Sequence, residues 1–440
     1  MKLCKCLLGL IGLCGHGFLL LLSTCNAYSL TLRTNFTQPD STNPNKVAIR
    51  FSGFLRHEMF FDFRQTVNAR EAMVTLYPEN VLPDENGKDI NARSHFNMLN
   101  INSRLRTELI GPTYFGAKTD ALIEIDFYGN ENRYFSDLNG LRLFNGYFRV
   151  VWPKTTLLLG QEWHPLSVKE VFPATVAFSA GAPFHPMSRN PQARVTQSIG
   201  NFKLMVAILS QRDFTGTGPE GPGSQYLRNS GVPNIHFQTY LGSDSSRIFG
   251  GAGIDYKKIV PELFTFGESG QLYKAKSHLN SLAATGFLRF HTKSLTFKGQ
   301  AVWSQNSFDL LMIGGYARSS ILNMRTGQSE FANLGTLSFW VDMSTQVIGR
   351  FTLGLFSGFS ENIGANKSII GEIYARAPNL KMLYRIAPRI IFTHNSLNLA
   401  FEPELTSAYY GLINGDGRGG VTGATEVSNL RFLISTRFNF

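Results

Sequence analysis

LRFLISTRFNF, residues 430–440, is the last stretch of the chain, and apolar and polar side chains alternate along it. The apolar residues of one face are Leu430, Phe432, Ile434, Phe438 and Phe440, and the polar residues of the other face are Arg431, Ser435, Arg437 and Asn439. Successive side chains of a β-strand point to opposite sides, so a period of two is typical of a strand whose faces meet different surroundings. This stretch therefore predicts a strand with one apolar face.

About sixteen segments of the chain share this alternation. In one of them, Ala121, Ile123 and Ile125 oppose Glu124 and Asp126. The expected spans are 46–58, 97–109, 117–128, 141–152, 156–163, 191–199, 202–211, 235–242, 247–255, 280–291, 294–305, 333–344, 350–359, 380–393, 396–406 and 429–440. Charges stay on one face of nearly every span. This favours contact with lipid, because a Lys or Arg that faces the bilayer midplane costs about 2–4 kcal/mol.

The connections between these spans alternate in length. Short links such as 200–201 and 394–395 separate long ones at 64–95, 164–190, 212–234, 256–279, 306–332 and 407–428. Every backbone amide must be paired in lipid, so a sheet there has to close on itself. The sequence predicts an all-β fold: a transmembrane antiparallel β-barrel of about sixteen strands over 46–440, with short periplasmic turns and long extracellular loops. A large soluble β-sandwich with one wet face is the alternative.

The N-terminus has the features of a secretory signal peptide over residues 1–27. Lys2 and Lys5 precede an apolar run, and small residues follow at 25–27. All four cysteines lie in or beside this segment, so cleavage after Ala27 leaves 440 − 27 = 413 residues without a cysteine and therefore without a disulfide. Lipid attachment at Cys25 and an uncleaved membrane anchor are alternatives. Residues 28–45 are expected to be a short periplasmic segment.

Charge and motifs argue against several other classes of protein. The formal net charge is +11, but Lys and Arg are spread along the chain and form no patch, so no nucleic-acid partner is expected. No histidine belongs to a serine-hydrolase, zincin or nucleophile-elbow motif, which predicts no enzyme, no cofactor and no metal. A metal or pore-lining role for His164 and His185 is the alternative to ordinary loop histidines.

A barrel of sixteen strands leaves a water-filled lumen, so the polar face predicts a pore lining. Its basic residues are expected to be Arg50, Arg56, Arg104, Arg106, Arg149, Arg194, Lys203, Arg289, Lys298, Lys381, Arg385, Arg389, Arg431 and Arg437. Its acidic residues are expected to be Glu108, Asp120, Glu124, Asp126, Asp342, Glu402 and Glu404. This basic excess predicts a preference for anions, whereas charges that merely hydrate the lumen and pair across strands would give none.

The third long connection, 164–190, differs from the others in composition. It has few charges and is rich in Pro, Ala and Phe, as in Phe172-Pro173-Ala174 and Ala182-Pro183-Phe184. A water-exposed loop of this length is normally more polar, so we expect this one to fold inward and narrow the barrel. Packing on a partner subunit or over the barrel mouth is the alternative.

Residues 102–196 resemble the DcaP-like porin family of Gram-negative outer membranes. The resemblance rests on Arg104-Leu105-Arg106, on Ile123-Glu124-Ile125-Asp126-Phe127-Tyr128-Gly129, on Leu141-Arg142-Leu143, on Gly160-Gln161-Glu162-Trp163 and on Arg189-Asn190-Pro191-Gln192-Ala193-Arg194. It implies a sixteen-stranded, trimeric channel for small, often anionic solutes such as dicarboxylates. The residues that it implies at the constriction are Arg104, Arg106, Glu124, Asp126, Gln161, Trp163, Arg189, Gln192 and Arg194, to which the inward face adds Arg149.

The sequence departs from this family before the barrel. Family members often carry a helical coiled coil there, but residues 28–45 are short, polar and without heptads. Trimerisation through such a coiled coil is therefore not expected. The terminal Phe440 resembles the aromatic signal read by the outer-membrane assembly machinery.

The function predicted from these features is passive diffusion through an outer-membrane porin of a Gram-negative bacterium. The expected partners are outer-membrane lipid, small anionic solutes, the assembly machinery and two further copies of the chain in a homotrimer. A non-conducting surface protein, such as an adhesin or a structural barrel, is the alternative.

Overall fold

The computed structural model describes residues 47–129 and 140–440, which belong to one compact unit. The expected signal peptide, 1–27, and the expected periplasmic segment, 28–45, lie outside the described residues.

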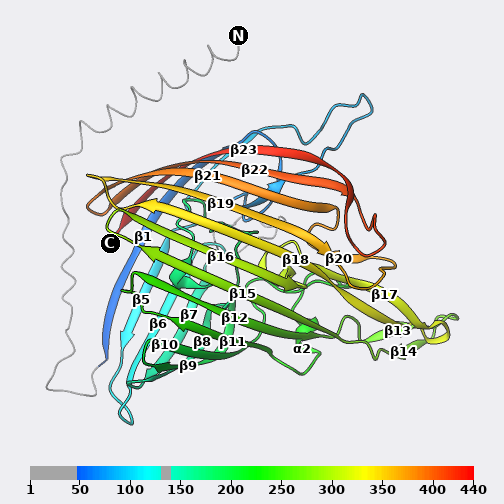
Figure 1. Ribbon diagram of the computed structural model, residues 1–440, viewed down its shortest axis with the longest axis horizontal. Coiled ribbons are helices and arrows are strands. Elements are labelled where there is room, and N and C mark those ends of the chain that lie inside the picture. Colours follow the sequence, from blue (N-terminus) through cyan, green and yellow to red (C-terminus); the bar gives the residue numbers. More distant parts are fainter. Residues whose placement is uncertain (1–46, 130–139) are drawn as a thin grey trace. The chain divides into compact units, whose positions relative to one another are not determined.

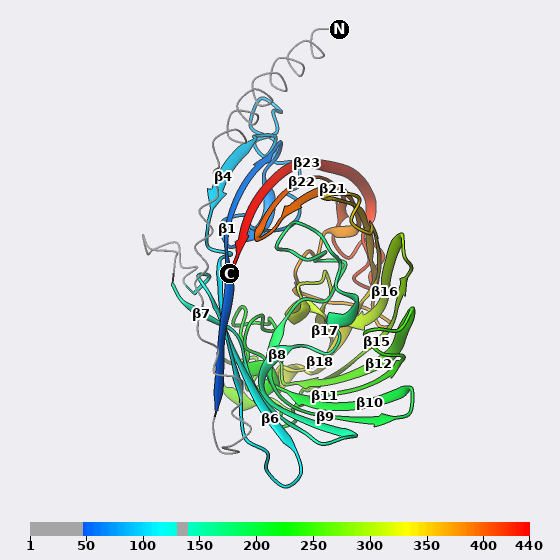
Figure 2. The same cartoon turned by 90° about the vertical axis from the view of Figure 1, so that its left-hand side faces the viewer.

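Sixteen antiparallel strands form a closed barrel, as predicted, and Figure 2 shows them ringing the chain segments in the lumen. β4 and β5 lie end to end along β1 and together form one of the sixteen. The strands are β1 (Ala48–Asp62), β4 (His95–Leu99) with β5 (Arg104–Ile110), β6 (Lys118–Asp126), β7 (Arg142–Val151), β8 (Thr155–Trp163), β9 (Arg189–Ile199), β10 (Phe202–Leu209), β11 (Asn234–Leu241), β12 (Ile248–Ile259), β15 (Leu279–His291), β16 (Leu295–Gln305), β18 (Gln328–Thr345), β19 (Phe351–Gly364), β21 (Leu380–His394), β22 (Leu397–Leu412) and β23 (Thr422–Asn439).

The barrel closes where β1 meets the last strand, β23. Their pairing runs from Phe54 opposite Asn439 to Asp62 opposite Arg431. Beyond β23, Phe440 and Gly53 exchange two backbone hydrogen bonds, of 3.1 and 3.0 Å. The final alternating stretch of the sequence therefore seals the sheet and leaves no edge along this seam.

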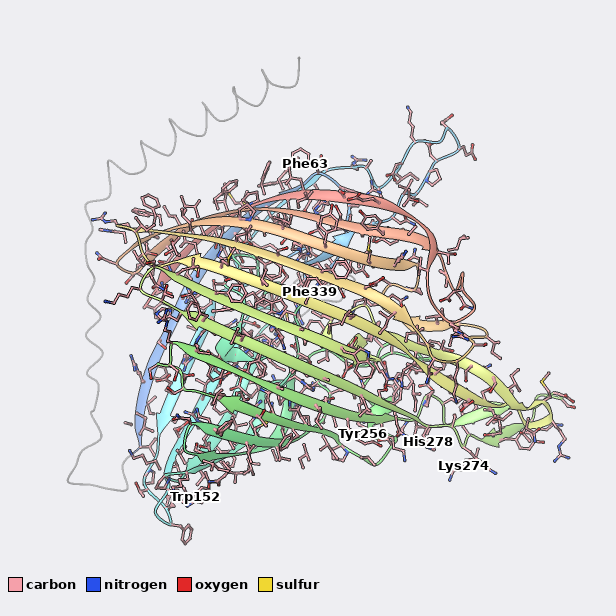
Figure 3. All side chains as sticks on the ribbon, viewed as in Figure 1. Phe63, Trp152, Tyr256, Lys274, His278 and Phe339 are labelled. Carbon is pink, nitrogen blue, oxygen red and sulfur yellow. The ribbon has the colours of Figure 1, made fainter. Side chains whose placement is uncertain are left out.

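The two faces of the wall have the polarity that the alternation predicts. On β23, Phe432, Ile434 and Phe438 are exposed on the outside, whereas Arg431 and Ser435 are buried on the inside. Phe339 of β18 lies on the same outer surface, near the middle of the wall (Figure 3). The register thus places the polar face inward, a choice that the sequence pattern alone could not make.

Short and long connections alternate along the barrel, as predicted. Short turns such as 152–154, 200–201 and 395–396 lie at one end, and Trp152 marks this end in Figure 3. Long connections gather at the other end, where Lys274 and His278 lie. One expected long loop is wrong: most of 407–428 belongs to β22 and β23, which leaves only 413–421 as their connection.

The remaining elements lie in the long connections. They are β2 (Thr66–Ala69), β3 (Val74–Pro78), β13 (Phe264–Phe266), β14 (Leu272–Lys274), β17 (Gly315–Asn323), β20 (Ile373–Ala375), the helix α2 (Gln225–Arg228) and the 3-10 helices η1 (Lys169–Val171), η2 (Phe308–Leu310) and η3 (Met324–Thr326). β13, β14 and β17 project at the long-loop end, on the right of Figure 1. Among the described residues, no helix has both the length and the apolar character that crossing a membrane requires.

Two segments fold into the lumen and pack against its wall. They are the third long connection, 164–188, and the β2–β3 hairpin of the first; Leu76 and Tyr77 of the hairpin share one buried cluster with Phe184 and Met187 of the connection. Arg385 of β21 donates hydrogen bonds to Ala182 O of the connection and to Leu76 O of the hairpin, at 2.9 and 2.8 Å. A single buried guanidinium therefore joins both segments to the wall. No pattern in the sequence indicates that the hairpin folds inward.

Candidate pore constriction

A cavity of about 670 Å³ remains between the 164–188 segment and the wall formed by β1, β5–β8 and β23. Its charged lining consists of five cations and two carboxylates: Arg56, Arg104, Arg106, Lys169, Arg437, Glu124 and Glu162. Its aromatic lining consists of Phe54, Phe144, Tyr147, Trp163, Phe172, Phe178 and Phe440. We call this space the constriction cavity.

Strands β18 and β22 of the barrel wall hold the 164–188 segment in place. Glu402 of β22 is fully buried and accepts the backbone N–H groups of Val176 and Ala177, both at 2.8 Å. Phe184 O accepts a hydrogen bond from Ser338 of β18 at 2.9 Å. These bonds satisfy backbone groups that a segment inside a barrel would otherwise leave unpaired. The segment is thereby fixed across the lumen and forms one side of the constriction cavity.

Three predicted residues form the charged wall of the cavity opposite that segment. Arg106 lies 2.6 Å from Glu108 and 3.3 Å from Glu124. Glu124 also accepts a hydrogen bond from Asn145 at 2.7 Å. The Arg104 guanidinium stacks on Phe144, 3.3 Å from the ring centroid, and forms no ion pair among the described residues. The charge of Arg104 is therefore free to act on a solute.

The predicted Trp163 forms the junction between the wall and the 164–188 segment. Its ring makes edge contacts with Phe144 of β7 and Phe172 of the segment, at 5.7 and 4.9 Å between centroids. Next to it, Lys169 reaches back to Glu162 at 2.8 Å. Aromatic contacts of this kind are worth about 0.5–1.5 kcal/mol each beyond the area they bury, so they favour a fixed position for the start of the segment.

The other predicted residues do not line the cavity but support its wall. Three are held in ion pairs: Asp126 with Arg142 at 2.6 Å, Arg149 with Asp120 at 2.7 Å, and Arg189 with Asp213 at 2.6 Å. Three bond to backbone carbonyls: Gln161 to Leu143 O at 2.9 Å, Gln192 to Glu162 O at 2.9 Å, and Arg194 to Trp163 O at 2.8 Å. These contacts hold β7, β8 and β9 in position around Trp163.

Several cavity residues are missing from the predicted constriction set. The sequence predicts Arg56 and Arg437 on the inward face but not at the constriction, because β1 and β23 lie far from β5–β9 in sequence. The closure of the barrel brings them together. Lys169 could have been found, since the 164–190 stretch contains few other charges.

One group of side chains in the described residues has the composition of a metal site. His164, His236 and Asp255 are buried, with ligand atoms within 4.8 Å of one another. However, both ring nitrogens of His164 already have hydrogen-bond partners: Nδ1 accepts the Leu166 N–H at 3.2 Å, and Nε2 lies 3.0 Å from Asn234 Nδ2. Burial lowers the pKa of His164 to about 4, which Asp255 offsets only in part, so the ring is neutral at pH 7. We assign this group as a hydrogen-bonded anchor for the start of the 164–188 segment.

Comparison with known proteins bears on the fold. No protein-family model matches the sequence, and the search of curated proteins gave no match either. Among solved structures, the outer membrane channel DcaP of Acinetobacter baumannii superimposes with a TM-score of 0.64 over 90% of this chain and 97% of that one, at 15% identity. The chain has a DcaP-like porin fold.

Other structures with this porin fold are more distant. The anion-selective porin from Comamonas acidovorans gives a TM-score of 0.52 at 10% identity, over 90% of this chain and 100% of that one. OmpF of Salmonella typhi, in complex with daunomycin, gives a TM-score of 0.52 at 9% identity, over 89% of this chain and 98% of that one. Identities this low establish a common fold, and function has to be argued from the site.

Proposed function

We propose that this chain is a passive diffusion channel in the outer membrane of a Gram-negative bacterium, selective for small hydrophilic anions such as dicarboxylates. The observation that carries this proposal is the constriction cavity, in which five cations face two carboxylates. Charged groups at the narrow part of a pore set its ion preference. The proposed transport needs no cofactor and no catalytic step.

Two of the lining cations lack a carboxylate partner in the described part of the chain, and this also favours anions over cations. Arg56 is neutralised by Glu58 at 2.7 Å, and Arg106 by Glu108 and Glu124. Arg104 and Arg437 form no ion pair among the described residues and instead stack on aromatic rings. A solute therefore meets uncompensated positive charge at these two side chains. The porin from Comamonas acidovorans, which has the same fold, is anion-selective, and this agrees with the proposed preference for anions.

The domain organisation that goes with this function is also a proposal. Residues 1–27 would direct export and be removed, 28–45 would lie in the periplasm, and 164–190 would narrow the barrel formed by 46–440. The short turns would then face the periplasm and the long connections the outside. Phe440, at the sealed β1–β23 seam, would be the residue that the assembly machinery reads.

A homotrimer is the proposed assembly. A cavity of about 470 Å³ opens beside the β4–β5 junction; Leu55, Phe127 and Phe438 line it together with the hydrogen-bonded pair His57 and Asn100. A polar pair in an apolar outer wall favours a protein neighbour over lipid. One structure of OmpT of Vibrio cholerae, 11% identical with a TM-score of 0.52, is a trimer form. Light scattering of the detergent-solubilised chain should give three times the monomer mass, and a monomer would refute this assembly.

A second candidate function is a non-conducting surface barrel. It is favoured by the β2–β3 hairpin, which folds into the lumen and packs against the 164–188 segment. Liposome swelling separates the two functions. Vesicles that contain the refolded chain should swell faster in an organic anion than in a cation of equal size. Vesicles that swell in neither would support the non-conducting barrel.

A further inference from the structure

The ring of Phe144 separates two groups of arginines along the wall. On the side of the constriction cavity, the Arg104 guanidinium lies 3.3 Å from the ring centroid. Arg189 stacks on the same ring at 3.9 Å but does not line the cavity. A solute at Arg104 is therefore one aromatic ring away from a second arginine group, which lies toward the long-loop end.

That second group surrounds one carboxylate. Arg189 lies 2.6 Å from Asp213 Oδ2, while Arg142 and Arg70 lie 3.2 and 3.7 Å from Oδ1. The Asp213 side chain is only 4% exposed. Three guanidiniums around one carboxylate, out of water, have the chemistry of a carboxylate-binding site. We call it the three-arginine site.

Negative charge is scarce around the three-arginine site. Asp126 is the other acid in direct contact, and Arg142 takes both of its oxygens, at 2.9 and 2.6 Å. Nη1 of Arg189 and Nε of Arg104 are buried without a hydrogen-bond partner among the described residues. A buried charged donor without an acceptor is costly. An anion bound at either arginine would supply the acceptor that its donor lacks.

Asp213 is attached to the wall differently from Arg142 and Arg189. Arg142 and Arg189 belong to barrel strands β7 and β9, whereas Asp213 lies on the 210–233 connection. Near Asp213, that connection is held by few side-chain bonds, one of which runs from Gln211 to Asp309 at 2.6 Å. The carboxylate can therefore leave while Arg142 and Arg189 stay on the wall.

We propose that a solute carboxylate exchanges with Asp213 at the three-arginine site, so that an arriving anion releases the 210–233 connection and opens the path past Phe144. This inference rests on the proposed function and deepens it: the loop carboxylate acts as a built-in competitor for the solute. No covalent bond changes, and the guanidiniums pass from one carboxylate to another. An anion that cannot form the paired hydrogen bonds of a carboxylate, such as chloride, displaces Asp213 poorly.

A cysteine reporter tests this exchange directly. The chain has no cysteine after residue 25, and Thr217, four residues beyond Asp213, is buried. The mature Thr217→Cys chain, refolded in detergent at pH 7, is treated with an uncharged maleimide in sodium acetate or in sodium chloride of equal ionic strength. Acetate should speed labelling about tenfold, within the usual range of coupling between sites. Equal rates in the two salts would overturn the proposal.

Two further substitutions in the reporter chain, and a third as control, test whether the Asp213–arginine contact is the latch that holds the 210–233 connection. With Asp213→Asn, labelling should be fast in chloride and should no longer respond to acetate. With Arg189→Gln, the response to acetate should be lost. With Arg350→Gln, an exposed arginine in the 346–350 turn, the response should match that of the reporter chain. An Asp213→Asn chain that stays protected would overturn the latch. If that variant fails to fold, the comparison of acetate with chloride in the reporter chain still decides.

The labelling assay needs no conduction, so its outcome is separate from that of the proposed function. A chain that conducts anions but labels equally in both salts refutes the exchange alone. If the chain responds to acetate but carries no current, the exchange at the three-arginine site is supported and the proposed channel function is refuted.

Discussion

Glu402 of β22, the strand paired with β23, accepts the backbone N–H of Val176 at 2.8 Å. The same carboxylate accepts the N–H of Ala177 at 2.8 Å. One side chain of β22 thus fixes the middle of the 164–188 segment, which forms one side of the constriction cavity. Pore size should therefore depend on a residue that does not line the cavity.

Substituting Glu402 with Ala should widen and destabilise the constriction. The change leaves two buried N–H groups without an acceptor, at about 1–3 kcal/mol each. We expect larger and noisier single-channel currents and faster cleavage within 164–188 by trypsin, at Lys169. Glu426→Ala serves as the matched control, because Glu426 is exposed and bonds to Tyr384 at 2.9 Å. Unchanged currents and cleavage in Glu402→Ala would refute this role.

Neutralising Arg104 should reduce anion preference more than neutralising an exposed arginine. Arg104 forms no ion pair among the described residues, so Arg104→Gln removes a charge that is not already compensated. The reversal potential of Arg104→Gln in a salt gradient should move toward zero. Arg350→Gln, in a short turn outside the cavity, should leave it unchanged. An equal shift in both variants would mean that net charge, and not the constriction, sets the preference.

Neutralising Arg106 should have a different result from neutralising Arg104. Arg106→Gln leaves the carboxylates of Glu108 and Glu124 without their shared partner. The cavity lining then holds an uncompensated negative charge at Glu124, so we expect the potassium-to-chloride permeability ratio to rise above that of Arg104→Gln. Measurement of both ratios in the same salt gradient checks this order, and the reverse order would contradict the pairing of Arg106 with the two carboxylates.

Removing Phe440 should weaken the closure of the barrel. The deletion takes away two backbone hydrogen bonds to Gly53, worth about 0.5–1.5 kcal/mol each. The refolded fraction, read from the heat-modifiable band on a gel, should fall. Phe440→Tyr keeps the backbone bonds and an aromatic ring and should refold like the parent. If the deletion refolds equally well, the seam does not depend on this residue.

Acid should release the 210–233 connection at a pH set by Asp213. Burial would raise the pKa of the Asp213 carboxyl, but Arg189, Arg142 and Arg70 outweigh it and hold that pKa below its usual value. The stability contributed by this group is fully present above the unfolded-state pKa of about 3.9 and is lost as pH falls through the lower folded-state value.

Pepsin provides the measurement, because it cleaves in this acid range. Cleavage within 210–233 should begin only below about pH 3.9 in the parent chain. In Asp213→Asn, cleavage should already occur at pH 5. Equal cleavage of both chains at pH 5 would contradict the role given to Asp213.

The barrel itself could be predicted because lipid imposes a strong local pattern. On β23, Phe432, Ile434 and Phe438 must be apolar, and this requirement is visible within a few residues. The pattern fades toward the long-loop end, where Ser407, Ala408 and Tyr410 of β22 are all buried and burial no longer alternates along the strand. That is why the upper parts of β22 and β23, such as Ser407 to Leu412, were expected to be loop.

The constriction could be predicted only in part, because it depends on contacts between distant segments. Arg104, Arg106, Glu124 and Trp163 lie close together in the barrel and were placed in one set. Arg437 joins them only through closure of the sheet, and Asp213 reaches Arg189 from a separate connection. The alternation within a single strand carries no information about such contacts between distant segments.

The most direct test of an anion-selective pore is the reversal potential of the refolded, purified mature chain in a planar bilayer with a potassium chloride gradient. We expect steady, large conductance steps and a reversal potential on the chloride side of zero, which moves toward zero in Arg104→Gln. A correctly folded barrel that carries no current, or one that prefers potassium, would contradict the proposed function.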